Sequence, residues 1–266
     1  MNPIYYHINE NCTEQPTNDH YHLHNHDEYE ILLFLEGDAK YIVEERTYSL
    51  EPCDIIVIRK HEMHRIYHNS MTRYRRVVLA VSPSFFQQNH CTEYEVQFSK
   101  APKGTGNKIS ADTVRSCGLF DAFSRYKQYS ENYALDVNSP ILVSILIEIL
   151  YLINKTSGFT SSDMTGTPMK SVLLYLNNRY AEDISLDMLG DKFYLSKYHL
   201  CRAFKKATGL TIHEYIRRKR LTRVRELRAE GKNITQAAME AGFHDYSSFY
   251  RAYLKEHGNP PKSDLC

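Results

Sequence analysis

The 266-residue chain has no tryptophan, almost no net charge and no long apolar run. Its longest apolar stretch, residues 141–153, contains Ser144 and Glu148 and is shorter than the roughly 20 residues that span a bilayer. The N-terminus lacks the charged start and apolar run of a signal peptide. These absences exclude a membrane-spanning class and lead us to expect a cytoplasmic protein.

Paired cysteines are also missing. The six cysteines are scattered and form no CxxC pair, so neither a disulfide framework nor a thiolate zinc site is indicated. A content of 42% hydrophobic and 24% charged residues is typical of a globular protein. The length suits one large domain or two ordinary ones.

The formal charge of +1 hides a strong asymmetry. Residues 1–167 hold 15 basic and 21 acidic residues, a net charge of −6, whereas residues 168–266 hold 18 and 11, a net charge of +7. A basic segment of this length on an acidic carrier is typical of a nucleic-acid-binding domain.

Two kinds of hydrophobic pattern divide the chain. Short β-type runs cover residues 29–35, 40–43, 47–50, 54–58 and 74–81, which predicts a sandwich or small barrel. From about residue 110 the spacing becomes helical, and Pro140 opens an apolar helix that runs to about Lys155. A Ser/Thr/Gly-rich linker follows, and after it we expect only helices. The predicted class is α+β, with a β-barrel followed by helices and an all-α C-terminal domain.

The basic segment repeats one layout twice. The first copy has helices over 185–193 and 197–208, with Ser196 as N-cap and Gly209 as the stop. The second has helices over 234–241 and 246–257, with Asp245 or Ser247 as N-cap and Gly258 as the stop. Each copy is a predicted helix-turn-helix.

A basic helix over residues 212–230 is predicted between the copies. Its length is about 28 Å, close to the roughly 34 Å of one DNA turn, so it can place two recognition helices in successive major grooves. A single copy taken alone fits an ordinary helical hairpin equally well. Duplication, the basic connector and the positive charge favour DNA binding.

A set of apolar, glycine and basic positions runs through both copies. These positions are Leu186, Leu189, Leu195, Ser196, Leu200, Arg202, Phe204, Lys205, Gly209, Tyr215, Arg220, Leu221, Ile234, Ala238, Gly242, Phe243, Ser247, Phe249, Arg251, Lys255, Gly258 and Pro261. Through them the segment resembles the DNA-binding domain of the AraC/XylS family of transcriptional regulators. Gly190 and Leu254 depart from the family, which usually has Ala and Lys at these places.

The resemblance implies residue roles at the DNA, where such helices place their N-terminal halves against base edges. The implied base readers are Tyr198, Cys201, Arg202, Tyr246, Ser247, Tyr250 and Arg251. The implied phosphate contacts are Lys197, Lys205, Lys206 and Lys255. Arg202 and Arg251 are the strongest candidates, since arginine reaches guanine O6 and N7 with two donors. Leu200, Phe204, Phe249 and Tyr253 are predicted to pack in the core.

A histidine-rich segment precedes the first β-type run. His20, His22, His24 and His26 alternate and would share one face of an extended strand. His24 and His26 are followed by Glu30 after three residues and by Gly37 after six more, which resembles the first motif of the cupin barrels.

In that family two such histidines, the glutamate and a later histidine, here His64, can hold a divalent metal. Arg59, His61 and His68 depart from the second cupin motif. Imidazole and carboxylate ligands suit zinc, iron or manganese.

Other interpretations of this segment remain open. One is an effector pocket without metal, formed by His24, His26, Glu30, Tyr41 and His64, in which the nearby tyrosines suit sugar-like ligands. Others are a metal-dependent cupin enzyme and a metal sensor that use His24, His26, Glu30 and His64.

The predicted organisation is that of a regulator and not of an enzyme. Residues 1–105 form a cupin-like effector-binding domain, 106–156 a helical dimerisation segment, 157–168 a linker, and 169–266 the DNA-binding domain. The apolar helix in the second segment is interpreted as a dimer interface, with packing onto the barrel as the alternative. The implied partners are double-stranded DNA, a small-molecule effector, a second copy of the chain and RNA polymerase.

Overall fold

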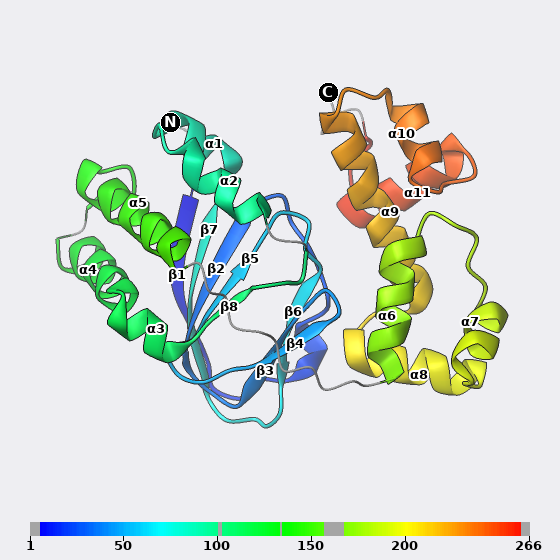
Figure 1. Ribbon diagram of the computed structural model, residues 1–266, viewed down its shortest axis with the longest axis horizontal. Helices are drawn as coiled ribbons and strands as arrows, with labels where there is room; N and C mark the ends of the chain where they lie inside the picture. The colour runs from blue at the N-terminus through cyan, green and yellow to red at the C-terminus, as the bar shows by residue number, and fades with distance from the viewer. Residues whose placement is uncertain (1–5, 101–102, 134, 157–167, 262–266) are drawn as a thin grey trace. The chain divides into compact units, whose positions relative to one another are not determined.

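The computed structural model describes residues 6–100, 103–133, 135–156 and 168–261. The chain divides into two compact units, Met1–Thr165 and Gly166–Cys266 (Figure 1). The first contains strands and helices and the described part of the second only helices, which confirms the predicted α+β class. Of the predicted linker, 157–168, only Pro168 lies within the described residues. No described helix has the length and apolar character needed to cross a membrane.

Two antiparallel sheets make up the barrel of the first unit. The larger has the strand order β1-β7-β2-β5-β8 and the smaller the order β4-β3-β6. The inner faces of both sheets share a core that includes Leu32, Phe34 and Tyr74. The strands are β1 (Tyr6–Thr13), β2 (Tyr29–Glu36), β3 (Ala39–Val43), β4 (Arg46–Ser49), β5 (Ile55–Ile58), β6 (His64–His68), β7 (Tyr74–Val81) and β8 (Lys108–Ile109).

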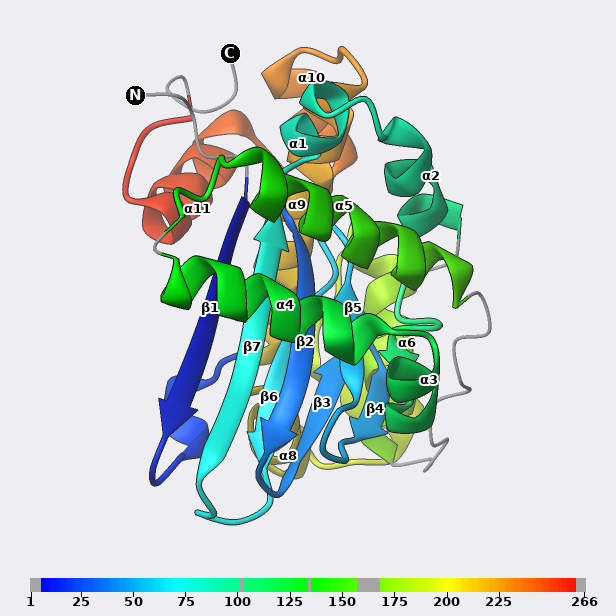
Figure 2. The same ribbon diagram turned by 90° about the vertical axis from the view of Figure 1, so that its left-hand side faces the viewer.

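Helices cover the outer face of the larger sheet, and α4 and α5 lie across it (Figure 2). Outward-facing Ile31 and Leu79 share one core with Leu146 and Ile149 of α5. The start of α5 is as predicted, because Pro140 occupies its first turn and the Ser139 side chain accepts a hydrogen bond from the Leu142 N–H. The helices are α1 (Pro83–Gln88), α2 (Thr92–Lys100), α3 (Ala111–Ser116), α4 (Leu119–Asn132) and α5 (Pro140–Lys155).

Several sequence expectations for this unit were incomplete or wrong. The sequence did not predict β1 or β6, whose inward-facing positions include polar side chains that hide the apolar alternation of a strand. The segment predicted to be helical from residue 106 begins with strand β8. The predicted row of four histidines on one strand is wrong, because Asn18–His20 form a 3₁₀ helix and His24 makes only an isolated bridge with His64.

The second unit contains both helix-turn-helix copies, α7–α8 and α10–α11. Each second helix begins at the predicted cap: Ser196 accepts from the His199 N–H and Asp245 from the Ser248 N–H. The helices are α6 (Pro168–Arg179), α7 (Leu186–Phe193), α8 (Lys197–Thr208), α9 (Ile212–Ala229), α10 (Ile234–Glu240) and α11 (Tyr246–His257).

Helix α9 packs against both helix-turn-helix copies. Val224 and Leu227 of α9 lie in one core with Phe249 of α11, and Tyr215 packs edge-on against Phe204 of α8 at 5.5 Å between ring centroids. Because α9 packs against both second helices, it fixes their separation.

Candidate functional site

The predicted DNA-contacting residues of the first copy lie on the exposed side of α8. Tyr198 is 75% exposed, and Arg202 and Lys205 follow it at helical spacing on the same face. The opposite face buries Leu200 and Phe204, as the sequence predicts. Lys197 and Lys206 are also exposed, whereas Cys201 is half-buried.

Helix α11 presents a similar face. Ser247, Arg251 and Lys255 recur every four residues and are all exposed or half-buried. Tyr246 and Tyr250 lie beside them, half-buried, with ring centroids 6.3 Å apart. Phe249 and Tyr253, on the other face, are buried in the core as predicted.

The cationic groups of the second unit fall into two sets. Arg202 and Arg251 make no salt bridge within the described residues, so their guanidinium groups are available to an incoming partner. By contrast, the arginines of α9 are bound inside the unit. Arg218 pairs with Glu256 at 2.7 Å, and Arg220 donates to the Tyr180 carbonyl oxygen at 2.7 Å. The connector therefore uses these two arginines to brace the unit and does not present them as a free basic surface.

Two glycines allow close backbone approaches around the helix-turn-helix copies. Gly242 has φ of +99°, and a Cβ there would lie 2.5 Å from the Ala181 carbonyl oxygen. A Cβ on Gly190 would lie 2.8 Å from the Leu195 carbonyl oxygen. A side chain at either position would therefore require the neighbouring backbone to move.

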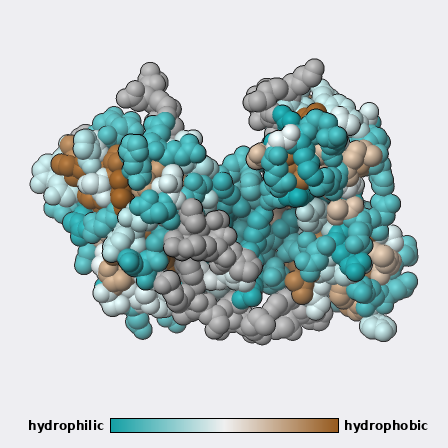
Figure 3. Space-filling model, turned by 45° about the horizontal axis from the view of Figure 1, so that its top comes forward, coloured by the Kyte–Doolittle hydropathy of each residue, from teal (hydrophilic) through white to brown (hydrophobic). Residues whose placement is uncertain are grey.

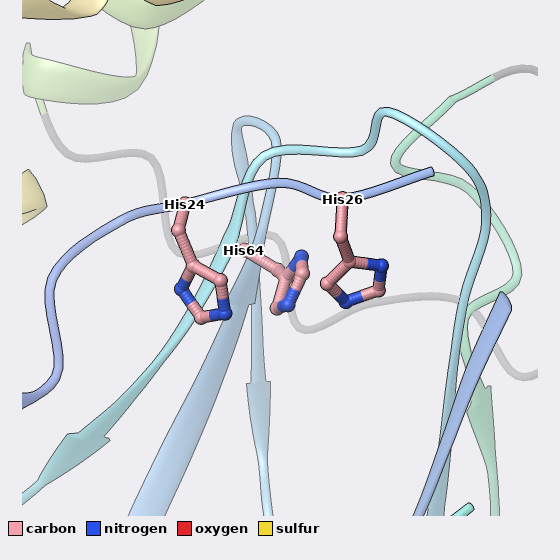
Figure 4. A group of neighbouring side chains, drawn as sticks. All are labelled: His24, His26 and His64. Atoms are coloured by element: carbon pink, nitrogen blue, oxygen red, sulfur yellow. The ribbon is translucent and has the colours of Figure 1, made fainter. Parts of the chain in front are cut away.

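In the first unit, the structure brings three of the predicted histidines together at one end of the barrel. His64 lies between His24 and His26 (Figure 4), with ring centroids 4.3 and 4.8 Å away, respectively. One ligand nitrogen from each of the three lies within 4.8 Å of the other two. His22 lines the neighbouring cavity, outside this cluster.

Backbone carbonyl groups orient all three rings. The Nδ1 atom of His24 lies 2.9 Å from the His22 oxygen, that of His26 2.9 Å from the Glu28 oxygen, and that of His64 2.8 Å from the Glu62 oxygen. A carbonyl oxygen only accepts, so each Nδ1 carries the proton and donates. In the neutral imidazole Nε2 is then left as the atom for a ligand, the arrangement that metal-binding histidines show. His26 Nε2 can instead donate to Glu30 when that ring carries a second proton.

Glu30 and Tyr41 complete the cluster. The Glu30 carboxylate accepts a hydrogen bond from His26 Nε2 and another from the Tyr41 hydroxyl, each at 3.2 Å. Burial alone would lower the pKa of His26, but the hydrogen bond and charge of Glu30 outweigh it and raise that pKa. Burial lowers the pKa of His64 to about 3, so this imidazole is neutral near pH 7.

These residues fit a divalent metal. His64 Nε2 is buried and has no hydrogen-bond partner, which is costly unless a ligand or ion meets it. Three imidazoles and one carboxylate suit zinc, iron or manganese. His24, His26, His64 and Glu30 would hold the ion.

A cavity of about 240 Å³ extends from Glu30 along the inside of the barrel. Of its lining, His24, Glu30 and Tyr41 were predicted from the sequence as effector contacts. The other polar residues of the lining come mainly from the unpredicted strands β1 and β6 and from β7; they are His7, Asn9, Asn11, Tyr21, His22, Arg65, Tyr74 and Arg76. The signal that would have found β1 is the alternation of His7, Asn9 and Asn11.

Comparisons with known proteins match both units of the chain. A family model described as an AraC-like ligand binding domain matches residues 7–120, and a helix-turn-helix domain model matches residues 189–264. The transcriptional activator RhaS of Citrobacter koseri is 24% identical over 247 residues, covering 90% of this chain and 85% of RhaS. RhaS of Escherichia coli K12 is 26% identical over 245 residues with the same coverage.

Solved structures add a weaker likeness. ToxT from Vibrio cholerae is 14% identical, with 98% of each chain covered, at a TM-score of 0.40. The two family models together match most of the chain, and its relatives are named as transcriptional activators, not as enzymes. The chain therefore belongs to the AraC family of transcription regulators, with an effector-binding domain followed by a helix-turn-helix DNA-binding domain.

Proposed function

We propose that this regulator works in the cytoplasm as a homodimer, in which a small effector in the barrel changes how the DNA-binding units engage operator DNA. The observation that carries the proposal is that α8 and α11 each have an exposed face that contains the candidate DNA contacts. Through their opposite faces both helices pack against the 18-residue helix α9. A helix of that length measures about 27 Å, close to one turn of DNA. An effector can change DNA binding only if it binds the DNA-engaging and the non-engaging arrangement of the protein with different affinities.

The residue roles that we propose at the DNA are those that the family resemblance implies, and the exposed faces of α8 and α11 support them. Arg202 and Arg251 read guanine, and Tyr198, Cys201, Tyr246, Ser247 and Tyr250 contact neighbouring bases. Lys197, Lys205, Lys206 and Lys255 meet phosphate. Lys197 must first leave Asp187, whose Oδ1 lies 2.5 Å from its Nζ. The named activity of the RhaS relatives supports activation of transcription, which involves contact with RNA polymerase.

Selection of bound sequences from a random DNA pool tests the proposal. We expect the full-length protein to enrich two short motifs spaced about one helical turn, roughly 10 base pairs, apart. Footprinting on the DNA upstream of its own gene then shows whether the natural site contains them. Failure to enrich any motif, with and without metal, would refute the proposal.

Support for the dimer comes from the outer side of α5. Six residues of this helix are buried in the core of the unit, so packing onto the barrel accounts for much of its apolar character. Ile141 and Tyr151 nevertheless remain 48% and 41% exposed. Figure 3 shows hydrophobic residues on the surface of the first unit, at the left of the view. Sedimentation of the full-length protein tests whether this surface joins two copies.

Removal of His64 is expected to weaken metal binding. His64→Ala deletes one of three convergent imidazoles, so we expect zinc affinity measured by calorimetry to fall at least about tenfold. Affinity is also expected to fall as pH is lowered through the raised pKa of His26, because a proton and the metal compete for Nε2. His90→Ala, an exposed histidine outside the cluster, is the control. Equal zinc affinity of wild type and His64→Ala would count against the metal site.

A metal-sensing role is a second candidate, favoured by the same convergence of three imidazoles. In that case zinc, iron or manganese alone changes operator affinity. Gel shifts with and without each ion, compared between wild type and His64→Ala, separate a sensed metal from one that only helps to hold an effector.

A further inference from the structure

The cavity in the barrel has two polar ends. One contains the histidine cluster and Glu30, and the strand register places Arg76 and Asn11 at the other. On the inner face, Asn11 of β1, Arg76 of β7 and Phe34 of β2 lie opposite one another. Four residues before Phe34 in β2, Glu30 lies opposite Ala80. Since a strand rises about 3.3 Å per residue, the backbone positions of these two ends are about 13 Å apart.

Arg76 is positioned by aromatic rings and not by an acidic partner. Its guanidinium carbon lies 4.7 Å from the ring centroid of Tyr74 and 5.9 Å from that of Tyr21. Its Nη1 atom is buried and has no hydrogen-bond partner, and Arg76 makes no salt bridge within the described part of the chain. A buried cationic donor is costly unless an acceptor meets it.

The lining of the cavity has more positively charged side chains than negatively charged ones. Arg65 and Arg76 both line it, and neither pairs with a carboxylate among the described residues. Among the described residues that line the cavity, Glu30 is the only one with a carboxylate, and its oxygens accept from His26 and Tyr41. A ligand that enters near Arg76 therefore meets uncompensated positive charge, together with the amides of Asn9 and Asn11.

The size of the cavity limits the ligand. Its volume of about 240 Å³ is below the roughly 300–1,000 Å³ of pockets for drug-sized molecules. A single ring or a short chain fits such a space. The amides and imidazoles of the wall offer both donors and acceptors, which hydroxyl groups satisfy.

We propose that the effector is a compact polyhydroxylated acid whose oxyanion, a carboxylate or a phosphate, pairs with Arg76 while its hydroxyl groups point toward the histidine cluster. The planar guanidinium fork binds either oxyanion through two parallel hydrogen bonds. The inference rests on the proposed function only in taking this cavity as the effector site.

Matched sugars of one ring test the proposal on the full-length protein. Glucose, glucuronate and glucose 6-phosphate, with galactose and galacturonate as a second pair, are compared by thermal shift and calorimetry at constant ionic strength. We expect at least one acid to raise the melting temperature while its neutral partner at equal concentration does not. Glucuronate and glucose 6-phosphate distinguish the two oxyanions.

Variants of two adjacent arginines locate the contact. Arg76→Gln is expected to weaken binding of the acid at least about tenfold, as for loss of a charge-assisted hydrogen bond, and Arg76→Lys to restore part of it. Arg75→Gln changes the neighbour on the opposite face of β7, where Arg75 pairs with Glu10 at 2.7 Å, and should bind as wild type.

Three outcomes would overturn the proposal: no shift with any acid, equal shifts with acids and neutral sugars, or unchanged binding by both Arg76 variants. Equal shifts in melting temperature with acids and neutral sugars would still support the cavity as the effector site if replacement of Tyr41 abolished them. The DNA selection contains no effector, so its result tests the proposed function separately.

Discussion

Loss of Arg202 and Arg251, the two arginines that we propose to read guanine, is expected to weaken sequence-specific DNA binding strongly. One bidentate contact from arginine to guanine contributes about 1–3 kcal/mol of discrimination, so Arg202→Ala and Arg251→Ala should each weaken operator binding by about 5- to 150-fold. The two residues lie in separate helix-turn-helix copies, and the effects of distant sites add. The double variant should therefore bind its operator at least about 30-fold more weakly.

Gel shifts with operator and scrambled DNA measure this effect. Binding to scrambled DNA should change little, because the lysines that we propose to meet phosphate remain and would carry affinity without sequence choice. Arg179→Ala is a matched control, since Arg179 is exposed on α6 and pairs with Glu182 at 3.1 Å. Equal losses on both DNAs would show that Arg202 and Arg251 contact phosphate and do not read bases.

A side chain at Gly242 is expected to destabilise the second helix-turn-helix copy. In Gly242→Ala the new Cβ would lie 2.5 Å from the Ala181 carbonyl oxygen and 2.6 Å from the Ala181 Cα, and φ is +99°. These are backbone atoms, so relief requires the chain at Ala181 to move. We expect a loss of about 2–4 kcal/mol in the free energy of unfolding, from strain and steric overlap together.

Urea unfolding of the full-length protein, followed by circular dichroism, measures this loss. Gly231→Ala is the matched control, because Gly231 has a similar φ of +90° but a Cβ added there would have no neighbouring atom within 4 Å. The free energy of unfolding of Gly231→Ala should fall by only about 1 kcal/mol, the cost of the left-handed backbone alone. Similar losses in the two variants would mean that the contact with Ala181 contributes nothing.

Several elements are determined by short-range signals in the sequence. Helix α8 begins after Ser196 and ends at Gly209, and α11 begins after Asp245 and ends at Gly258, because capping involves residues only a few positions apart. Both helices, and α5 after Pro140, have the predicted bounds. The spacing of His24, His26 and Glu30 likewise brings these side chains together over a short segment.

Other features depend on contacts between distant residues. The sequence did not predict β1, whose inward positions His7, Asn9 and Asn11 line a cavity, because hydrophobic periodicity reports only apolar burial. Arg76 faces that cavity through the register of β7 with β1 and β2.

The charge count also does not show what the arginines of α9 contact. Their basic sequence favours DNA, yet Arg218 pairs with Glu256, 38 positions later in the chain. The sequence by itself thus determined the family, the two recognition helices and the histidine motif, which are encoded by local spacing. Only the tertiary structure decided which cations are free and which polar residues line the cavity, because pairing and burial between distant segments are properties of the folded chain.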